Sequence, residues 1–265
     1  MHIREFALGA ISACVVALAP VSAQAANIQL GFVLDESGSI TTSEWNIIRT
    51  GLASALNLIP VSGVDSYYLS VVTFDDNANT RIANTLVTSL NRASLATTVS
   101  NMAQGGQTTN YQAAFLAIDT AMGNSNSYDF SYVNFATDGA PNTCDNNNNP
   151  TTAQAQACGV SARNTLIASG IDNISIEGIG VNTTNASFLQ NSICYPGPCD
   201  TTAPYNFPTE GFYIGVANAT QYAAAIQNKV RIVTGQLPEP GTIALAGLAL
   251  AGLGLARRRK QAGSS

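Results

Sequence analysis

The feature that most constrains this chain is an apolar run, Leu30–Leu34, that ends in a carboxylate and two hydroxyls. The run has no polar alternation, which is typical of a strand buried on both faces of a parallel sheet. Asp35, Ser37 and Ser39 follow at alternate positions, and a helical periodicity then covers residues 45–58. Such a loop places oxygen atoms where α/β sheets bind ligands, and oxygen ligands suit a hard divalent cation.

Two other interpretations of this loop stay open at this point. Serine and glycine after a strand often form only a turn that caps the next helix. A phosphate-binding turn is the other alternative, but neither the dinucleotide glycine pattern nor a Gly-Lys-Ser/Thr sequence is present. Corroboration has to come from further along the chain.

Both ends of the chain have the form of targeting segments. Residues 1–25 predict a secretory signal peptide, with a basic start, an apolar run and the small-residue site Ala23-Gln24-Ala25; a membrane anchor is the alternative. In residues 237–265, Pro238-Glu239-Pro240 precedes an apolar run over 241–256 and four cations at 257–260. As a helix the run would span roughly 24 Å, so it needs its flanks to cross the ~30 Å membrane core, with the cations on the cytoplasmic side.

The order Pro-Glu-Pro, apolar helix, arginine cluster resembles the bacterial PEP-CTERM sorting signal. The resemblance implies recognition by an exosortase-type transpeptidase, cleavage near the motif, and release or anchoring at the cell exterior. A plain tail anchor is the alternative. We therefore expect a secreted or surface-located protein whose C-terminal helix is embedded in the membrane at least before processing.

Charge and cysteine content narrow the function of the segment between these ends. Residues 26–237 carry 14 acidic and 6 basic residues, a net charge of −8, which argues against nucleic-acid binding. Four cysteines lie outside the signal, an even number that suits disulfides in an oxidising compartment. Of the three possible pairings we favour Cys144–Cys158 and Cys194–Cys199, because each would hold one loop, and we expect both loops to border the ligand-binding edge. A zinc site is the alternative, but this segment has no histidine.

Strands and helices alternate along residues 26–236, which predicts an α/β fold with a mostly parallel sheet, one antiparallel edge strand and helices on both faces. Residues 75–79 predict a solvated hairpin turn, and Glu177 lies inside a strand pattern, where we expect a satisfied or edge position rather than a catalytic role. Expected strands cover 30–34, 67–74, 81–87, 130–136, 174–181 and 211–216; expected helices cover 45–58, 90–102, 112–122, 153–168, 186–191 and 219–233.

Two further segments repeat the pattern of the opening loop. A Gly105-Gly106 pair leads into Thr109-Asn110 before a helix, and Thr137-Asp138-Gly139 is followed by Pro141-Asn142 after a strand. With Asp-x-Ser-x-Ser, this ordered set resembles the von Willebrand factor type A domain and its metal-ion-dependent adhesion site. The resemblance covers nearly all of residues 26–236 and implies a three-layer, Rossmann-like fold.

The resemblance also implies roles for individual residues. Ser37 and Ser39 would bind the cation through their hydroxyls, and Asp35 and Asp138 largely through water. Thr109 is the preferred threonine ligand, with Thr108 as the alternative, because Thr109 is spaced as in the family from the small and apolar residues of the next helix. Mg²⁺ fits best, since it keeps waters and needs few protein ligands, with Mn²⁺ or Ca²⁺ as alternatives.

In this family an acidic side chain of a partner completes the coordination of the cation. The resemblance therefore implies adhesion to an acidic protein or polysaccharide, or an interaction with an extracellular matrix, without enzymatic turnover. A passive structural component of the matrix is the first alternative. A metal-assisted hydrolase is the second, although nothing beyond Asp35 and Asp138 offers a general base and the absence of histidine from this segment excludes Ser-His and Cys-His pairs.

Overall fold

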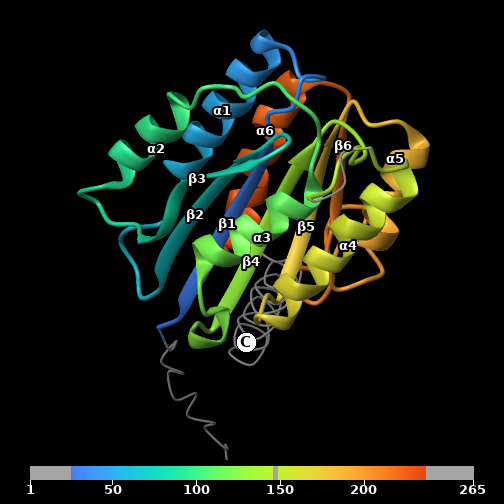
Figure 1. Cartoon of the computed structure of the whole chain (residues 1–265). Coiled ribbons are helices and arrows are strands. Elements are labelled where there is room, and N and C mark those ends of the chain that lie inside the picture. The colour runs from blue at the N-terminus through green and yellow to red at the C-terminus, as the bar shows by residue number, and fades with distance from the viewer. Residues whose placement is uncertain (1–24, 146–148, 237–265) are drawn as a thin grey trace, which may run out of the picture.

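A six-stranded sheet runs through the centre of the computed structural model, which describes residues 25–145 and 149–236 (Figure 1). The strand order is β3-β2-β1-β4-β5-β6, and every neighbouring pair is parallel except β2 and β3. This confirms the expected fold class. The strands are β1 (Asn27–Asp35), β2 (Ser66–Phe74), β3 (Ala78–Leu86), β4 (Phe130–Thr137), β5 (Asn173–Ile179) and β6 (Tyr213–Val216).

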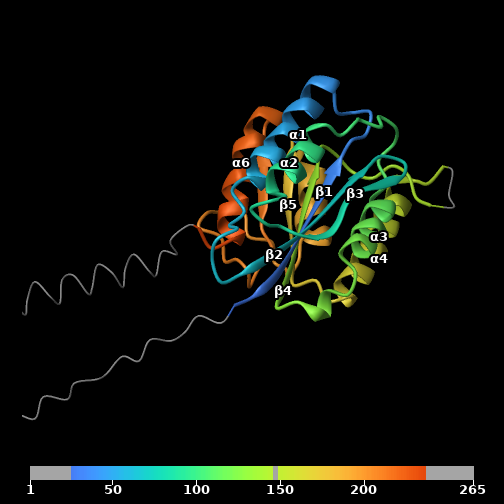
Figure 2. The ribbon, with the colours of Figure 1, turned by 90° about the vertical axis from the view of Figure 1, so that its left-hand side faces the viewer.

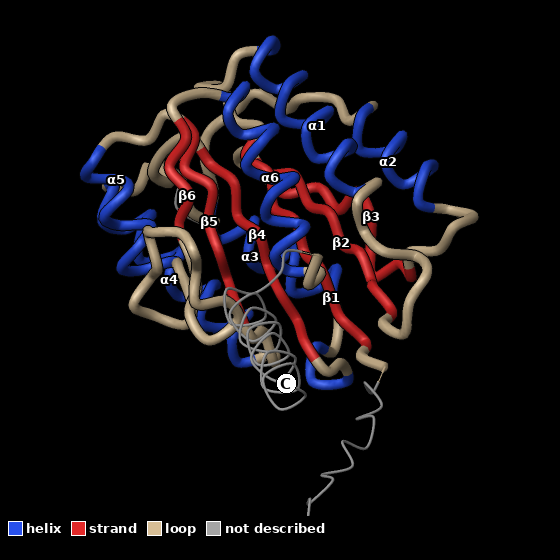
Figure 3. Tube along the Cα trace, turned by 180° about the vertical axis from the view of Figure 1, so that it is seen from behind, coloured by secondary structure: helices blue, strands red, loops and turns tan. Residues whose placement is uncertain are grey.

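Helices cover both faces of the sheet (Figures 2 and 3). One layer contains α1 (Thr42–Leu56), α2 (Arg92–Ser100) and α6 (Ala219–Val233), and the other contains α3 (Tyr111–Met122), α4 (Thr152–Ala168) and α5 (Thr183–Phe188). A π-helical turn, η2 (Leu189–Ile193), continues α5, and a short 3₁₀ turn, η1 (Ser125–Ser127), precedes β4. Each layer has its own hydrophobic core against the sheet.

The strand β1 lies at the centre because its side chains are apolar on both faces. Eight of its nine residues are buried, and it pairs with β2 on one side and β4 on the other. On the α3 face, Phe135 packs with its ring centroid 4.8 Å from the rings of both Tyr111 and Phe115. Because β1 and β4 are held in parallel register, their carboxyl ends, Asp35 and Thr137, reach the same edge of the sheet.

Local signals set the start of α1 directly after the β1 loop. The Thr41 hydroxyl accepts a hydrogen bond from Glu44 N at 3.3 Å, and the Glu44 carboxylate accepts one from Thr41 N at 2.9 Å. This capping box satisfies two backbone donors at the helix N-terminus. The helix therefore begins at Thr42, three residues before the apolar periodicity that predicted it.

The hairpin between β2 and β3 is tighter than expected. The turn closes when Asp75 N donates to Asn77 O at 2.8 Å and Asn77 N donates to Asp75 Oδ1 at 3.1 Å, so β3 begins at Ala78 rather than Arg81. The prediction of a solvated turn holds for Asp76, which is exposed, but was wrong for Asp75, which is buried.

Both predicted disulfides are present, but only one lies at the predicted edge. The loop that contains Cys194–Cys199 lies at the amino end of β5, where Ile174 N donates to Tyr195 O at 2.7 Å. The strand β6 pairs only with residues 176–179, and this loop covers the part of β5 that β6 leaves free. The expectation that this loop borders the ligand-binding edge was therefore wrong.

The signal peptide predicted for residues 1–25, except Ala25, and the predicted C-terminal apolar helix lie outside the described residues. Within the described ranges, we find no helix with the length and apolar character that a membrane crossing requires.

Candidate metal centre

Loops after β1, before α3 and after β4 meet at the carboxyl edge of the sheet (Figure 1). Two backbone hydrogen bonds join the first two loops: Gly38 N donates to Gln107 O at 2.8 Å, and Gly106 N donates to Glu36 O at 3.0 Å. A Cβ atom at Gly38 would lie 2.9 Å from the Gly106 carbonyl oxygen. Glycine is needed here because it alone allows the two backbones to approach so closely.

Hydrogen bonds connect the oxygen-bearing side chains of the β1 loop with that of the residue after β4. Ser37 N donates to Asp35 Oδ1 at 2.9 Å, and the hydroxyls of Ser37 and Ser39 lie 3.2 Å apart. The Ser39 hydroxyl then donates to Asp138 Oδ1 at 3.0 Å. The fold thus brings four of the five predicted ligands together from two separate strands.

The fifth predicted ligand, Thr109, lies against the loop that carries Asp138. Its backbone N donates to Asn142 Oδ1 at 2.8 Å, and its carbonyl oxygen accepts from Asn142 N at 3.0 Å. Thr109 is 5% exposed, whereas the neighbouring Thr108 is exposed. The choice of Thr109 over Thr108 as a ligand stays a prediction.

The two aspartates of the cluster are poorly solvated. Burial, and after it the nearby Asp138 carboxylate, together raise the pKa of Asp35 from 3.8 to about 7. Burial also raises the pKa of Asp138. Because both shifts oppose ionisation, a cation bound between the carboxylates would compensate charge that the fold alone leaves uncompensated.

Glu36, between Asp35 and Ser37, is held away from this cluster by an arginine. Its carboxylate is fully buried and lies 3.2 Å from the Arg81 guanidinium, whose Nε also donates to Thr73 Oγ1 at 2.8 Å. Glu36 therefore has its own counter-ion and links the loop after β1 (residues 36–41, the metal-edge loop) to β3.

Sequence reasoning assigned no role to two residues that support the cluster from beneath. Thr137 donates its hydroxyl to Asp35 Oδ2 at 2.7 Å, and the fully buried Tyr111 donates to Gly139 O at 2.5 Å. Thr137 could have been found from its place in the Thr-Asp-Gly segment. Tyr111 could not, because nothing local indicates that its hydroxyl reaches across to the β4 loop.

A Tyr111→Phe variant tests this support. We expect it to lose about 1–2 kcal/mol of unfolding free energy, because the Gly139 carbonyl oxygen loses its buried donor, and to bind a divalent cation more weakly because the Asp138 loop is less well held. Urea unfolding and calorimetric titration would measure the two effects. Tyr128→Phe is a matched control, since that hydroxyl only accepts from Asn84 at 2.8 Å on the exposed side of the molecule. Equal losses in both variants would contradict the assignment.

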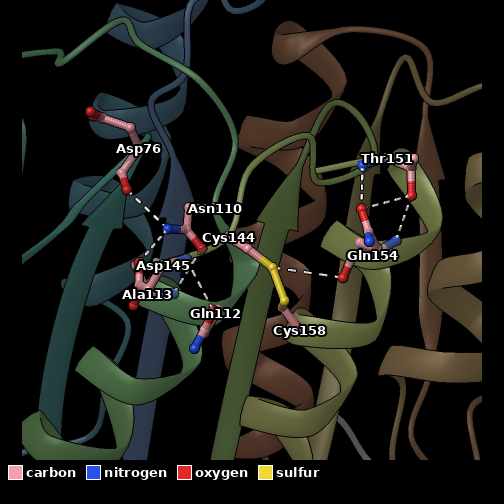
Figure 4. The surroundings of a disulfide bond; sticks show 9 residues. All are labelled: Asp76, Asn110, Gln112, Ala113, Cys144, Asp145, Thr151, Gln154 and Cys158. Carbon is pink, nitrogen blue, oxygen red and sulfur yellow. Dashed lines mark hydrogen bonds between the residues drawn. A yellow bond between two sulfur atoms is a disulfide. The ribbon is translucent and has the colours of Figure 1, made fainter. Parts of the chain in front are cut away.

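The first disulfide lies beside this edge (Figure 4). Cys144–Cys158 joins the loop after β4 to α4. The neighbouring Asp145 accepts from Asn110 Nδ2 at 2.7 Å, and its backbone N donates to Gln112 Oε1 at 3.1 Å. These contacts tie the segment after Asn142 to the start of α3, next to Thr109.

A hollow of about 190 Å³ opens beside Ser39 and Asp138, between the start of α1 and the loop after β6. Its other lining residues are Ile40, Glu44, Ile48, Ile179, Gly180, Ala217 and Asn218. Nowhere in the described ranges, this edge included, do three acidic, histidine or cysteine side chains gather in a way that would hold a metal ion. A cation at this edge would therefore depend on hydroxyl oxygens as well as carboxylates.

Family models match the chain in two places. The model of the von Willebrand factor type A domain matches residues 29–203, and that of the PEP-CTERM protein-sorting motif matches residues 236–260. No curated protein sequence matches the chain.

Several solved structures share the fold. The PilB minor pilin from Streptococcus sanguinis is 17% identical with a TM-score of 0.60, over 83% of this chain and 64% of that one. The vWF domain of the type V pili tip protein Mfa5 from Porphyromonas gingivalis is 11% identical with a TM-score of 0.56, over 82% of this chain and 98% of that one.

A third similar structure is proximal thread matrix protein 1 from the mussel byssus. It is 14% identical with a TM-score of 0.56, over 78% of this chain and 46% of that one, so this chain spans about half its length. Another structure of that protein has a zinc-occupied MIDAS motif. At these identities the likeness shows the fold alone, whereas the family model covers most of the sequence. The chain belongs to the von Willebrand factor type A domain family and carries a PEP-CTERM protein-sorting motif.

Proposed function

We propose that this exported, surface-sorted protein binds a divalent cation at Asp35, Ser37, Ser39, Thr109 and Asp138, and through it an acidic group of a protein or polysaccharide. The observation that carries the proposal is a set of hydrogen bonds that links Asp35 to the backbone N of Ser37, the Ser37 hydroxyl to the Ser39 hydroxyl, and the Ser39 hydroxyl to Asp138. Hydroxyl and carboxylate oxygens in such an arrangement are a donor set that suits hard cations.

The donor set fits Mg²⁺, with Mn²⁺ or Ca²⁺ as alternatives. Both Asp35 oxygens already accept hydrogen bonds, from Ser37 N and from the Thr137 hydroxyl, which favours contact with the cation through water. Mg²⁺ usually keeps several waters in its coordination shell. Zinc in the MIDAS motif of the mussel protein supports a divalent cation of some kind without identifying it.

The partner follows from the charge that the site leaves on the cation. Neutral hydroxyls neutralise no charge, so a divalent cation held mainly by them stays electrophilic and attracts a carboxylate. The hollow beside Ser39 and Asp138 offers room for neighbouring atoms of the partner. The proposed function is binding without catalytic turnover. The pilus and thread-matrix names of the similar structures are consistent with adhesion or a matrix interaction.

The arrangement of the domain suits adhesion from a surface. Gln236, the last described residue, donates to Leu58 O at 2.5 Å, and Leu58 lies just beyond the end of α1. The other end of α1 begins at Thr42, next to the metal-edge loop. The sorting motif at 236–260 therefore follows from the edge opposite to the proposed site, which would direct the site away from an attachment point.

The test is calorimetric titration of Mg²⁺, Mn²⁺ and Ca²⁺ into the native protein and into a Ser37→Ala/Asp138→Ala variant. We expect the double variant to bind at least about 100-fold more weakly, because it loses two proposed ligands, one of which carries a charge. Thr109→Ala and Thr108→Ala form a matched pair, and only the first is expected to reduce affinity.

Partner binding is tested with a polyuronate and a poly-glutamate peptide in the presence of Mg²⁺ or a chelator. Retention that requires the cation and is lost in the double variant supports the proposal. Equal heats from both proteins, or cation binding without retention of either acidic probe, would favour a passive matrix component. Multiple turnovers of a substrate would contradict a purely binding function.

A further inference from the structure

A second polar cluster lies deep in the core on the α6 face of the sheet, away from the proposed metal site. Glu177 on β5 is fully buried and faces Lys229 on α6, with Oε1 2.9 Å from Nζ. The other oxygen of the same carboxylate accepts a short hydrogen bond from the side-chain amide of Asn134 on β4. One carboxylate thus bridges an amine and a carboxamide.

Lys229 is an unusual residue to find in this position. The chain has only two lysines, and the other is Lys260 in the basic tail. A lysine on a surface keeps its ammonium group hydrated, but Lys229 is 2% exposed. A buried ion pair costs much of its Coulombic gain in desolvation, so stability alone is a weak reason for placing it here.

The surroundings exclude water from the three groups. Lys229 Nζ lies 4.8 Å from the ring centroid of the fully buried Phe212, and the fully buried Tyr222 is on the same helix. Among the described residues, Asn134 Oδ1 has no hydrogen-bond partner, and Lys229 Nζ has only its ion pair with Glu177. Buried polar atoms without partners are costly, so this cluster carries an energetic penalty as it stands.

We propose that Lys229 and Asn134 form an intramolecular isopeptide bond, with Glu177 as the group that transfers the protons. The geometry points to this reaction because the carboxylate contacts both the nitrogen that would attack and the nitrogen that would leave. Holding the reacting groups together in a dry core supplies the proximity that such a reaction requires.

The steps balance without any further reactant. The ammonium of Lys229 first gives a proton to Glu177, which leaves a neutral amine and a carboxylic acid. The amine nitrogen attacks Asn134 Cγ, Glu177 protonates the departing carboxamide nitrogen, and its carboxylate then takes a proton from the former Lys229 nitrogen. The carbon–nitrogen bond of the Asn134 carboxamide breaks, a new amide bond joins Asn134 Cγ to the Lys229 nitrogen, and ammonia leaves. Glu177 ends as a carboxylic acid that can hydrogen-bond to the new amide.

Two properties of the core support these steps. Burial lowers the pKa of Lys229 and raises that of Glu177, so both shifts favour the neutral pair that the attack requires. A cavity of about 10 Å³ lined by Asn134 and Lys229 adjoins the cluster, which is about the room that one water-sized molecule, such as the leaving ammonia, occupies.

The bond would have a mechanical consequence. The helix α6 is the last described element before the sorting motif, and β4 ends next to Asp138. A covalent link between α6 and β4 would carry a pulling force from the attachment side directly to a central strand. The inference does not depend on cation binding.

The experiment is mass spectrometry of the full chain, purified from cells that export it and measured after reduction of the disulfides. We expect a mass lower by one ammonia molecule than that calculated for the chain between its observed termini, and proteolytic fragments in which the segments around Asn134 and Lys229 are joined. An amine-reactive label applied under denaturing conditions should modify the α-amine, and Lys260 where the tail is retained, but not Lys229.

Variants identify the residues that make the bond. Glu177→Gln, Lys229→Met and Asn134→Leu should each show the full mass. Ser175→Ala removes another residue of the same cavity lining and should keep the bond. A folded native protein with the full mass and a labelled Lys229, unchanged after long incubation, would overturn the proposal and leave a buried ion pair. A joined fraction in the native protein that Glu177→Gln abolishes would support it.

Discussion

The cation-free protein is expected to be less stable at pH 8 than at pH 5, and a divalent cation should remove most of that difference. The reason is Asp35, whose pKa is raised from 3.8 to about 7 by burial and by Asp138. Between these two values the folded chain keeps a proton that the unfolded chain releases, so unfolding free energy falls as pH rises. The part of this shift that lies between pH 5 and pH 7 corresponds to about 2.7 kcal/mol for this fully buried group.

Cation binding should show the opposite dependence on pH. The cation competes with the proton on Asp35, so affinity at pH 5 should be roughly 100-fold weaker than at pH 7 and above. A cation at a concentration of about 100 times its dissociation constant would add about 2.7 kcal/mol to the unfolding free energy. Urea unfolding at both pH values, with Mg²⁺ or with a chelator, would measure these effects.

The matched control is Asp35→Asn, which keeps the size of the side chain and removes its charge. We expect this variant to be more stable than the native chain at pH 8 without a cation, and to gain nothing from Mg²⁺. A native chain whose stability is the same at both pH values, or an Asp35→Asn variant that Mg²⁺ still stabilises, would show that Asp35 does not have the role assigned here.

Phe135→Ala is expected to cost about 3–5 kcal/mol of unfolding free energy, because it leaves a cavity among three aromatic rings. Phe135 is fully buried and stacks with Phe74 at 5.4 Å and with Phe115 at 4.8 Å between ring centroids. The neighbouring strands cannot collapse into the space, since backbone pairing holds β4 between β1 and β5. Chemical denaturation with the disulfides intact would give the value.

Phe130→Ala is the control, because it removes the same side chain from the same strand at a position that is 40% exposed. We expect it to cost less than about 1 kcal/mol. A similar loss in both variants would mean that the aromatic cluster around Phe135 does not stabilise this face of the sheet.

The sequence by itself determined the features that depend on near neighbours along the chain. Apolar continuity identified β1 as a central strand, and the carboxylate and hydroxyls after it marked the edge where a ligand would bind. The pairing Cys144–Cys158 followed from the segment between the two cysteines. Such signals are readable because capping, periodicity and short loops act over a few residues.

The repeated motifs also predicted which distant segments meet. Parallel strands bring their carboxyl ends to one edge, so a carboxylate after one strand and a carboxylate after another had to be close. The structure places Ser39 and Asp138 in hydrogen-bond contact across 99 positions. Their binding of a cation is still a proposal that titration has to test.

Only the tertiary structure decided which residues are buried, and which ones contact each other, when the contacting residues are far apart in the sequence. Asp75 is buried because the loop before α3 packs against it, with Gly105 next to its carboxylate and Asn110 N donating to its carbonyl oxygen at 2.8 Å, and the Cys194–Cys199 loop covers β5 because β6 is short. Glu177 read as an ordinary strand residue, yet it meets Asn134 and Lys229 once β4, β5 and α6 pack together. Those contacts depend on strand order and helix placement, which long-range packing fixes and local sequence does not record.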